Sequence, residues 1–423
     1  MKYFIWCAKF ALPLAVALGT MASDSANTLP VLIVGGGIGG VATALALSRR
    51  GRPVQVLEQA HEFREIGAGI QMPPNAFKAF AALGVLDAVR AVAAYPDDLK
   101  FGDMLTGEIV YRAPIDDGFI SRFGYRYALL HRADILECLV AACRESDLVT
   151  LTPGERVTRF TDVGDRVVVE TAAGTIYEGC GLVCSDGLWS LGRAALIDDG
   201  LPPTDGYVLC RGVVPVEDIP EELYSKTVTM WGGPGLDFFH YPLRRHEIFN
   251  IGASYFDPHI QPGPNYPTIT REHFLRQFKD ACPHVKALLQ HIDVSRTWVL
   301  HHRLPVKDWS KGRVTLLGDA AHPTSIYISQ GACMALEDAV ILAEIVGETS
   351  SIEQAFEQYR NARYLRTARI QFTSREFGKL YHARGVQREL RNRLLSQAGP
   401  GALADALAWL WGSDLSATQE GVC

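Results

Sequence analysis

Six residues near the start of the chain have the types and spacing of a turn that binds a phosphate group. They read Gly35-Gly36-Gly37-Ile38-Gly39-Gly40 and stand between a predicted strand and a predicted helix. Gly35 permits a tight turn, Gly37 lets the backbone approach a pyrophosphate at the positive end of the helix, and Gly40 allows the helix to pack closely on the strand. Glu58 ends the next predicted strand, where its carboxylate can accept hydrogen bonds from a ribose. The pattern predicts a dinucleotide site and suits NAD and FAD equally.

Three further stretches contain glycines and carboxylates that can hold the rest of such a cofactor. They read Gly67-Ala68-Gly69-Ile70-Gln71, Cys184-Ser185-Asp186-Gly187 and Leu317-Gly318-Asp319-Ala320-Ala321-His322-Pro323. For His322 we expect a structural role rather than a catalytic one. The sequence contains no HExxH pattern and no CxxC pair, so we expect no metal site.

With these stretches the chain resembles the group A flavoprotein aromatic hydroxylases, whose GxGxxG, DG and GD motifs they match. The likeness runs from about residue 31 to about residue 414 and is nearest to the branch of 3-hydroxybenzoate 6-hydroxylases and salicylate hydroxylases. It rests notably on Arg122-Phe123-Gly124, His131-Arg132 and His240-Tyr241-Pro242-Leu243-Arg244. The resemblance implies an α/β protein with the aromatic-hydroxylase fold: a Rossmann-like FAD-binding domain, an inserted β-sheet-rich substrate domain and C-terminal helices.

The resemblance also implies FAD as the cofactor and assigns residues to it. Arg132 would meet the FAD phosphates, Asp319 would hold the ribityl chain, and Gln71 would lie beside the flavin. Asp186 would help to position both FAD and the nicotinamide donor, NADPH or NADH. Ala332 has a physical reason of its own, because it stands at the start of a predicted helix whose amides and dipole can stabilise negative charge on a reduced flavin.

The activity that the resemblance implies is that of a single-component monooxygenase. NAD(P)H would reduce FAD, O2 would form a flavin C4a-hydroperoxide, and a hydroxyl group would pass to a phenolic or aromatic-acid substrate. We expect Tyr241 to deprotonate or polarise the phenol and Arg211 to serve the substrate or the flavin. The competing interpretations are a tyrosine packed in a sheet face and a structural salt bridge. His240 adjoins Tyr241, so in one regular strand the two side chains face opposite sides.

Two expected pocket residues depart from the nearest branch of the family. The 3-hydroxybenzoate enzymes carry a histidine in the stretch that here reads Gly235-Leu236-Asp237, and a glutamine where this chain has Ile326. These changes alter which ring substituents can be hydrogen-bonded, because a buried polar group left unpaired costs about 1 to 3 kcal/mol. Asp237 would repel an anionic substrate unless Arg211 or Arg244 offsets it, which favours a neutral phenol or a larger natural-product intermediate. Asp237 is also an alternative base, unless it is a solvent-facing turn residue.

The elements that must position these residues can be predicted from hydrophobic patterning. A strand at 31–34, a helix at 39–50 and a strand at 54–57 form a βαβ unit, and residues 166–184 have the alternation of a β-meander. Helices are expected at 333–346 and from 352 toward 382. The predicted divisions are an N-terminal extension at 1–29, a discontinuous FAD-binding domain at 30–195 and 301–385, a substrate-binding domain at 196–300 and a helical tail at 386–423.

The composition and net charge limit the kinds of binding partner that we expect. The chain is 48% hydrophobic and 21% charged with a net charge of −6, which gives no electrostatic reason to expect nucleic acid. Arg360, Arg363, Arg366 and Arg369 recur at a spacing of three, and we interpret them as a solvated, salt-bridged helix face. We expect a small aromatic substrate and O2 as partners and keep a homodimer open.

The first residues allow three interpretations. Lys2 followed by the apolar run at 10–18 has the pattern of a signal peptide, and a membrane-associated segment is a second interpretation. The third is that Met21 is the natural start. A cytoplasmic location is favoured, because NAD(P)H is a cytosolic reagent and the nine cysteines are scattered as reduced thiols would be.

Other functions on the same scaffold stay open. Oxidative decarboxylation of a salicylate-type acid, ring epoxidation and dearomatisation would use the same cofactor. A non-catalytic FAD-binding module is the alternative from another class, and the altered positions Asp237 and Ile326 are its only support. Substrate-stimulated NAD(P)H consumption separates the enzyme from the binding module.

Overall fold

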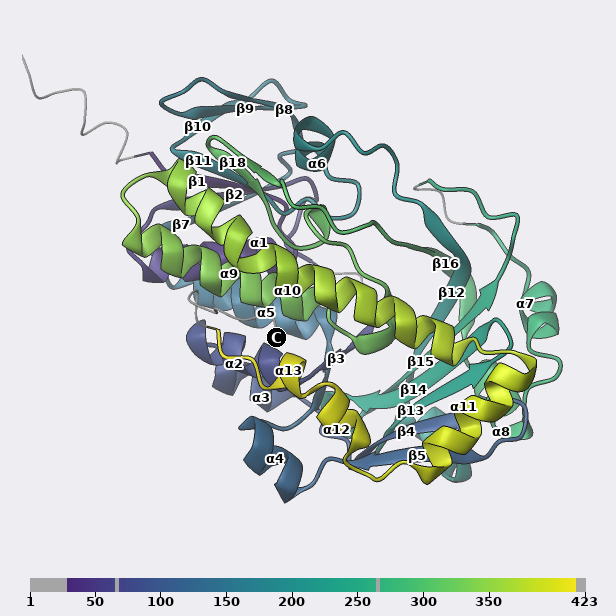
Figure 1. Cartoon of the computed structure of the whole chain (residues 1–423). Coiled ribbons are helices and arrows are strands. Elements are labelled where there is room, and N and C mark those ends of the chain that lie inside the picture. The colour runs from purple at the N-terminus through teal and green to yellow at the C-terminus, as the bar shows by residue number, and fades with distance from the viewer. Residues whose placement is uncertain (1–28, 65–67, 264–266, 416–423) are drawn as a thin grey trace, which may run out of the picture.

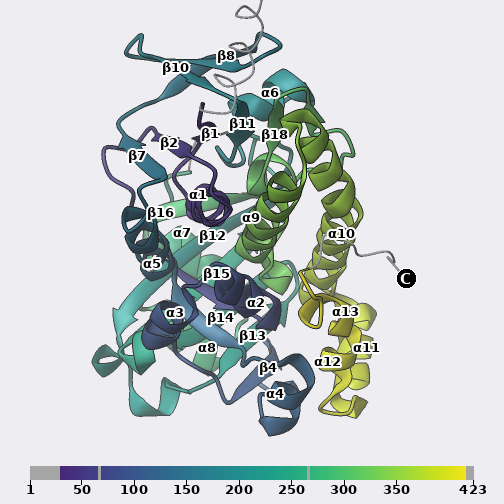
Figure 2. The same ribbon diagram turned by 90° about the vertical axis from the view of Figure 1, so that its left-hand side faces the viewer.

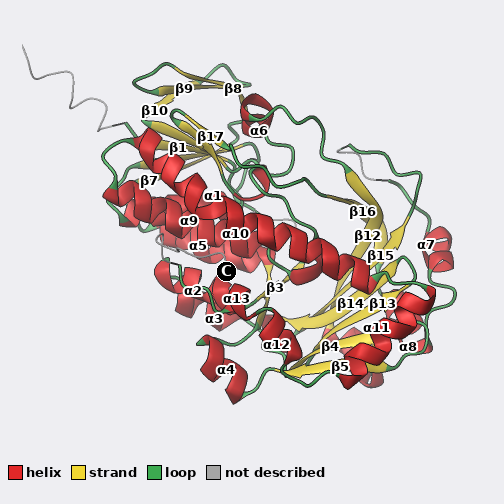
Figure 3. Ribbon diagram, viewed as in Figure 1, coloured by secondary structure: helices red, strands yellow, loops and turns green. Residues whose placement is uncertain are grey.

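Residues 29–64, 68–263 and 267–415 are described by the computed structural model. They form two large sheets at opposite ends of the molecule, with long helices running between them, and two smaller sheets (Figure 1, Figure 3). The expectations for residues 1–28 lie outside the described residues. Within the described ranges, no helix combines the length and the apolar composition that crossing a membrane requires.

The first sheet has six strands and carries the predicted βαβ unit. Strand β1 lies in its interior and pairs in parallel with β2 and β11, and helices cover the sheet, so all four β1 side chains are buried. In order across the sheet the strands are β17 (Ser310–Lys311), β18 (Val314–Leu316), β11 (Gly181–Cys184), β1 (Val31–Val34), β2 (Val54–Glu58) and β7 (Val149–Pro153). The meander forms the small sheet of β8 (Val157–Asp162), β9 (Val167–Thr171) and β10 (Ile176–Gly179) before the chain returns through β11.

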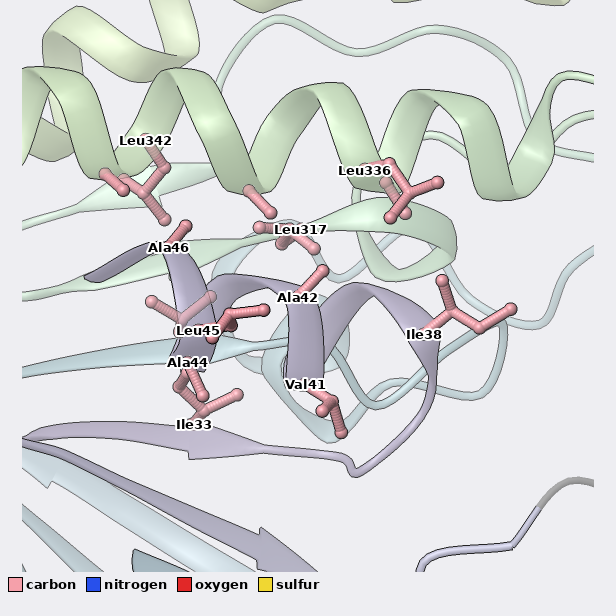
Figure 4. Close-up of a cluster of buried hydrophobic side chains, with 14 of the residues drawn as sticks. Ile33, Ile38, Val41, Ala42, Ala44, Leu45, Ala46, Leu317, Leu336 and Leu342 are labelled. Carbon is pink, nitrogen blue, oxygen red and sulfur yellow. The ribbon is translucent and has the colours of Figure 1, made fainter. Parts of the chain in front are cut away.

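Small residues let two helices approach each other over this sheet. Ala42 and Ala46 of α1 (Ile38–Arg49) point toward α9 (Gly331–Glu348), from which Leu336 and Leu342 project (Figure 4). All four side chains are buried in one hydrophobic cluster. The glycine turn is thereby held against the helix that begins at residue 331. Both helices were predicted from the sequence, and the structure confirms them with ends shifted by one or two residues.

The second sheet has seven strands and forms the lower right of Figure 1. In order they are β16 (Asp293–His301), β12 (Thr204–Pro215), β15 (Ile248–Phe256), β14 (Leu236–Leu243), β13 (Val228–Gly233), β4 (Asp98–Asp103) and β5 (Ile109–Pro114). Pairing is antiparallel except between β13 and β4. Strands β4 and β5 come from the 30–195 stretch and join strands that lie almost entirely in the 196–300 stretch, so the two predicted sequence regions share one sheet.

The remaining elements cover the two sheets and connect them. Helix α10 (Ile352–Tyr381) confirms the helix predicted from 352 toward 382, and it runs from the first sheet to the second (Figure 1). The others are β3 (Gly69–Met72), β6 (Ala128–His131), α2 (Pro74–Ala82), α3 (Leu86–Val92), α4 (Asp117–Phe123), α5 (Arg132–Arg144), α6 (Leu191–Leu196), α7 (Arg271–Gln277), α8 (Pro283–Leu289), α11 (Gly385–Gln397), α12 (Ala402–Ala406), α13 (Ala408–Trp411) and the 3-10 turns η1 (Val216–Asp218), η2 (Glu221–Leu223), η3 (Arg244–His246), η4 (Gly318–Ala320) and η5 (Ile326–Ile328).

The arginines of α10 correct one prediction. Arg363 is fully buried, where a solvated face was expected, and it donates to Glu337 at 2.8 Å and to Asp338 at 2.7 Å on α9. Arg366 donates to Glu337 at 2.7 Å as well. The salt bridges of Arg363 and Arg366 join α10 to α9, whereas Arg360 pairs with Glu357 on its own helix as expected. The error has a physical reason, because a spacing of three describes a face of a helix without saying what packs on it.

Candidate active site

The glycine turn has the backbone geometry that its sequence predicts. Gly35 has φ of +103°, and a side chain there would clash with the carbonyl oxygen of Ser185. A Cβ on Gly40 would clash with the carbonyl oxygen of Gly35. Glu58 accepts hydrogen bonds from the backbone N–H of Gly36 at 2.6 Å and of Ala60 at 2.8 Å. The turn, the helix and the carboxylate are therefore one preformed unit.

A cavity of about 350 Å³, here called the central cavity, extends from this turn to the second sheet. Its walls combine backbone of several glycine stretches with side chains from β12, β13 and β14. The lining includes Gly37, Gly39, Gln71, Arg132, Gly187, Arg211, Met230, Phe239, Tyr241, Gly318, Asp319, Ile326, Gly331 and Ala332. Residues that are far apart in the sequence thus meet in one site.

The structure places most predicted site residues on this cavity and a few beside it. Asp186 lies behind the wall: its Oδ2 accepts from the N–H of Leu191 at 2.7 Å, while its Oδ1 is buried without a hydrogen-bond partner among the described residues. Burial raises the pKa of Asp186. Its neighbours Ser185 and Gly187 line the cavity. Asp186 therefore shapes the loop that faces the cavity.

The groups that line the central cavity fit a long ligand that has phosphates at one end and, at the other, a ring that can take up negative charge. Glycine backbone at residues 37, 39, 69, 187, 318 and 331 leaves room that any Cβ would narrow. Arg132 supplies a cation, and Gly331 and Ala332 present the first turn of the 18-residue helix α9. These features suit the pyrophosphate and the ring of FAD.

Tyr241 and Arg211 reach the cavity from strands on either side of β15. Arg211 and Phe239 both pair with Gly252, and because this residue lacks a side chain, the Phe239 ring can lie over the strand. The Arg211 guanidinium carbon lies 5.6 Å from the Phe239 ring centroid, and its Nε is buried without a hydrogen-bond partner among the described residues. Burial raises the pKa of Tyr241 to about 12, against the opposing effect of the Arg211 charge.

His240 points to the other face of the sheet, as strand alternation predicted. Its Nε2 accepts a hydrogen bond from the indole N–H of Trp231 at 3.2 Å. Burial lowers the pKa of His240 to about 3, so the ring is neutral at ordinary pH. Tyr241 is thus the member of the His-Tyr pair that faces the central cavity.

Asp237 and Ile326 are placed differently. Ile326 lines the central cavity. Asp237 is buried beside it, where it accepts hydrogen bonds from the hydroxyl of Ser254 and from His382 Nε2, the latter at 2.8 Å. The His382 ring stacks on Tyr207 at 4.1 Å between centroids. Asp237 is thus hydrogen-bonded to Ser254 and His382, and it is not among the residues that line the central cavity.

A buried network supports the loop that carries Asp319. Asp338 on α9 accepts hydrogen bonds from the N–H of Gly318 at 3.1 Å and from Arg363 at 2.7 Å, and His322 Nε2 lies 2.6 Å from it. Burial alone would raise the pKa of Asp338, but His322 and Arg363 hold it below its usual value. This geometry matches the structural role predicted for His322.

A second cavity, here called the apolar cavity, adjoins the first. It measures about 240 Å³ and shares Gln71, Met230 and Ser329 with the central cavity. The hydroxyl of Tyr127 donates to Gln71 Oε1 at 2.7 Å on this side. Sequence patterns did not predict it, because helices α10 to α13 form much of its wall and their docking is not readable from motifs.

Comparison with known proteins agrees with this geometry. A family profile described as an FAD binding domain matches residues 28–371. The 3-hydroxybenzoate 6-hydroxylase of Polaromonas naphthalenivorans (strain CJ2) is 41% identical over 393 residues, covering 92% of this chain and 97% of the relative. The 3-hydroxybenzoate 6-hydroxylase 1 of Aquipseudomonas alcaligenes is 39% identical, covering 91% and 98%.

Solved structures show the same architecture. Klebsiella pneumoniae HpxO in complex with FAD and uric acid superposes with a TM-score of 0.81 at 27% identity, covering 90% of this chain and 96% of that chain. A salicylate hydroxylase substrate complex superposes with a TM-score of 0.77 at 25% identity, covering 94% and 100%.

Proposed function

This chain belongs to the FAD binding domain family and is an FAD-dependent aromatic hydroxylase, and from that premise we propose that Tyr241 and Arg211 bind the hydroxyl group of a phenolic substrate. FAD, when bound, takes electrons from NAD(P)H and activates O2. The observation that carries the proposal is that both side chains line the same cavity as the first turn of α9.

Each end of the central cavity would bind a different part of FAD. We assign the phosphates of FAD to the glycine turn and Arg132, its ribose to Glu58 and its ribityl chain to Asp319. Gln71 would lie beside the ring, and the N–H groups near Ala332 would offset negative charge on it. Support comes from the lining of the cavity, which includes Gly37, Gln71, Arg132, Asp319 and Ala332, while Glu58 hydrogen-bonds to the glycine turn beside it.

The two second-sheet residues would divide the work on the substrate. Because burial keeps Tyr241 neutral, its hydroxyl donates a hydrogen bond to the ring oxygen rather than removing the proton. Arg211 stays cationic even where burial lowers its pKa, so it favours the phenolate form of the substrate. Together they would hold a ring that is activated for electrophilic attack.

Substrate-stimulated reduction tests the proposed function. The purified holoenzyme is mixed anaerobically with NADH or NADPH and a panel of phenols and aromatic acids, and flavin absorbance is followed. A phenol that accelerates reduction and yields a hydroxylated product on admission of O2 supports the proposal. Slow reduction that no compound changes contradicts it. A product that has lost its carboxyl group would indicate oxidative decarboxylation instead.

Two further expectations belong to the same proposal, one on the oligomeric state and one on the location. We propose that the chain forms a homodimer and acts in the cytoplasm, where NAD(P)H is available. Sedimentation of the holoenzyme at micromolar concentration tests the first, and fractionation of the producing cells tests the second.

A further inference from the structure

The apolar cavity is positioned to receive a part of the substrate. It opens beside the central cavity at Gln71, Met230 and Ser329, which line both. Met230 is unbranched and flexible, so it can yield to a ligand that passes from one cavity to the other. A molecule whose ring lies near Tyr241 therefore has a neighbouring space of about 240 Å³ within reach.

The chemistry of this space is apolar. Leu99, Val228, Ile328, Phe377 and Trp411 line it and belong to one hydrophobic cluster. Among the described lining residues, Lys100 alone carries a charge at neutral pH. Ordered water requires two to four polar partners, which such a wall offers at few places. The cavity thus favours hydrocarbon over water.

The far end of the apolar cavity reaches the C-terminal helices. Ala398, Ala402 and Ala406 line it there, and Ala406 is exposed. In Figure 2 the helices α11, α12 and α13 lie together below α10 and close to β4. Because the side chains at this end are small, part of the apolar cavity would stay empty if the substrate were a single benzene ring with polar substituents.

We infer that the substrate carries an apolar substituent, an alkyl chain or a second ring, that occupies the apolar cavity while its phenol ring lies in the central cavity. The inference rests on the proposed function and adds the substrate class to it. Ile326 is consistent with this class, because an alkyl side chain on the central cavity offers no hydrogen bond to a second polar substituent on the ring.

Binding measurements test the inference directly. Dissociation constants of phenols with alkyl chains of one to five carbons at position 3 or 4 are measured on the holoenzyme from the change in flavin absorbance. Affinity is expected to rise about three- to fourfold per methylene in at least one series, as burial of a CH2 group predicts. Affinity that is independent of chain length in both series would overturn the inference.

Substitutions that fill the apolar cavity show whether the alkyl chain binds there. Ala402→Phe should weaken binding of the pentyl phenol at least tenfold and leave binding of unsubstituted phenol within twofold. Ala404→Phe, on the same helix but outside the apolar cavity, is the matched control and should change neither. Ala398→Leu provides a second filling if the first variant fails to fold. Equal effects at positions 402 and 404 would count against the inference.

Failure of the inference and failure of the proposed function are distinguishable. If unsubstituted phenols are hydroxylated and longer chains gain nothing in affinity, the function stands and the inference falls. If no phenol of any length accelerates flavin reduction, the proposed function itself falls.

Discussion

The protonation state of Tyr241 decides what this residue can do. Burial raises its pKa to about 12, so the side chain is protonated near neutral pH and can donate a hydrogen bond. A neutral phenol cannot take a proton from the substrate, but it can stabilise the phenolate that forms. The pH dependence of activity should therefore show no ionisation of Tyr241 between pH 6 and pH 9.

Replacement of this tyrosine tests the donor role. Tyr241→Phe is expected to lower kcat/KM about ten- to hundredfold, because a hydrogen bond to a charged group contributes about 1.5 to 3 kcal/mol. Steady-state kinetics with the best phenol of the panel measures the loss. Tyr255→Phe is the control, since Tyr255 is buried in the same sheet and lines neither cavity. The donor role is rejected if both variants behave alike.

At the scale of residues, the sequence predicted the parts of the site that depend on local backbone geometry. Gly35 and Gly40 follow from a turn whose rules are known. Asn250 was missed, although its side chain accepts a hydrogen bond from the N–H of Gly69 at 2.9 Å and so joins the second sheet to β3. Nothing in the local pattern marks it, because the partner is 181 residues away.

Among the elements, helix α11 is held in place by one buried carboxylate. Asp103 at the end of β4 accepts hydrogen bonds from Arg388 and Asn392, each at 2.6 Å, and from Arg391 at 3.2 Å. Burial alone would raise the pKa of Asp103, but these partners hold it well below its usual range. The carboxylate therefore stays charged and attached at every pH near neutrality, and α11 stays over the apolar cavity.

Loss of this charge should release the helix. Asp103→Asn leaves Arg391 buried without its counterion, and breaking such a buried pair costs about 3 to 5 kcal/mol. Hydrogen exchange at residues 385–397 should accelerate, and the Tm should fall. Asp308→Asn, which removes an exposed partner of Arg360, should cost less than about 1 kcal/mol. Unchanged exchange in the first variant would mean that α11 is held by its other contacts.

The predictability of elements follows the range of their contacts. The βαβ unit and helices α9 and α10 were predicted because hydrophobic periodicity sets them locally. The pairing of β4 with β13 was not, since it joins residues about 130 positions apart in parallel, and the strand pattern alone names no partner. The burial of Arg363 was mispredicted for the same reason.

For the whole molecule, the central cavity joins the two sheets. Its lining includes Gly37 and Gly318, which follow strands β1 and β18 of the first sheet, and Arg211 and Tyr241 from strands of the second. A ligand that contacts both groups stabilises the folded state by linkage, by about 2.7 kcal/mol at a hundred times its Kd. We therefore expect FAD to set the stability of both halves together.

Removal of the cofactor provides the measurement. The apoprotein should have a lower Tm than the holoenzyme, and added FAD should raise it in a concentration-dependent manner. The chain has seven tryptophans. Trp309 directly precedes strand β17 of the first sheet and Trp231 lies in the second, so single-tryptophan variants that retain Trp309 or Trp231 alone report each half by fluorescence. Two transitions that separate in the holoenzyme would show that FAD does not couple the halves.

The residues that line the two cavities are completed at different times while the chain is synthesised. The described residues that line the central cavity end at Ala335, whereas the wall of the apolar cavity includes Leu395, Ala402 and Trp411. Chains emerge from the ribosome N-terminus first. A nascent chain thus contains all the described residues that line the central cavity before α11 to α13, which form part of the wall of the apolar cavity, have been made. The apolar cavity is therefore the later of the two to be walled off as the chain is made.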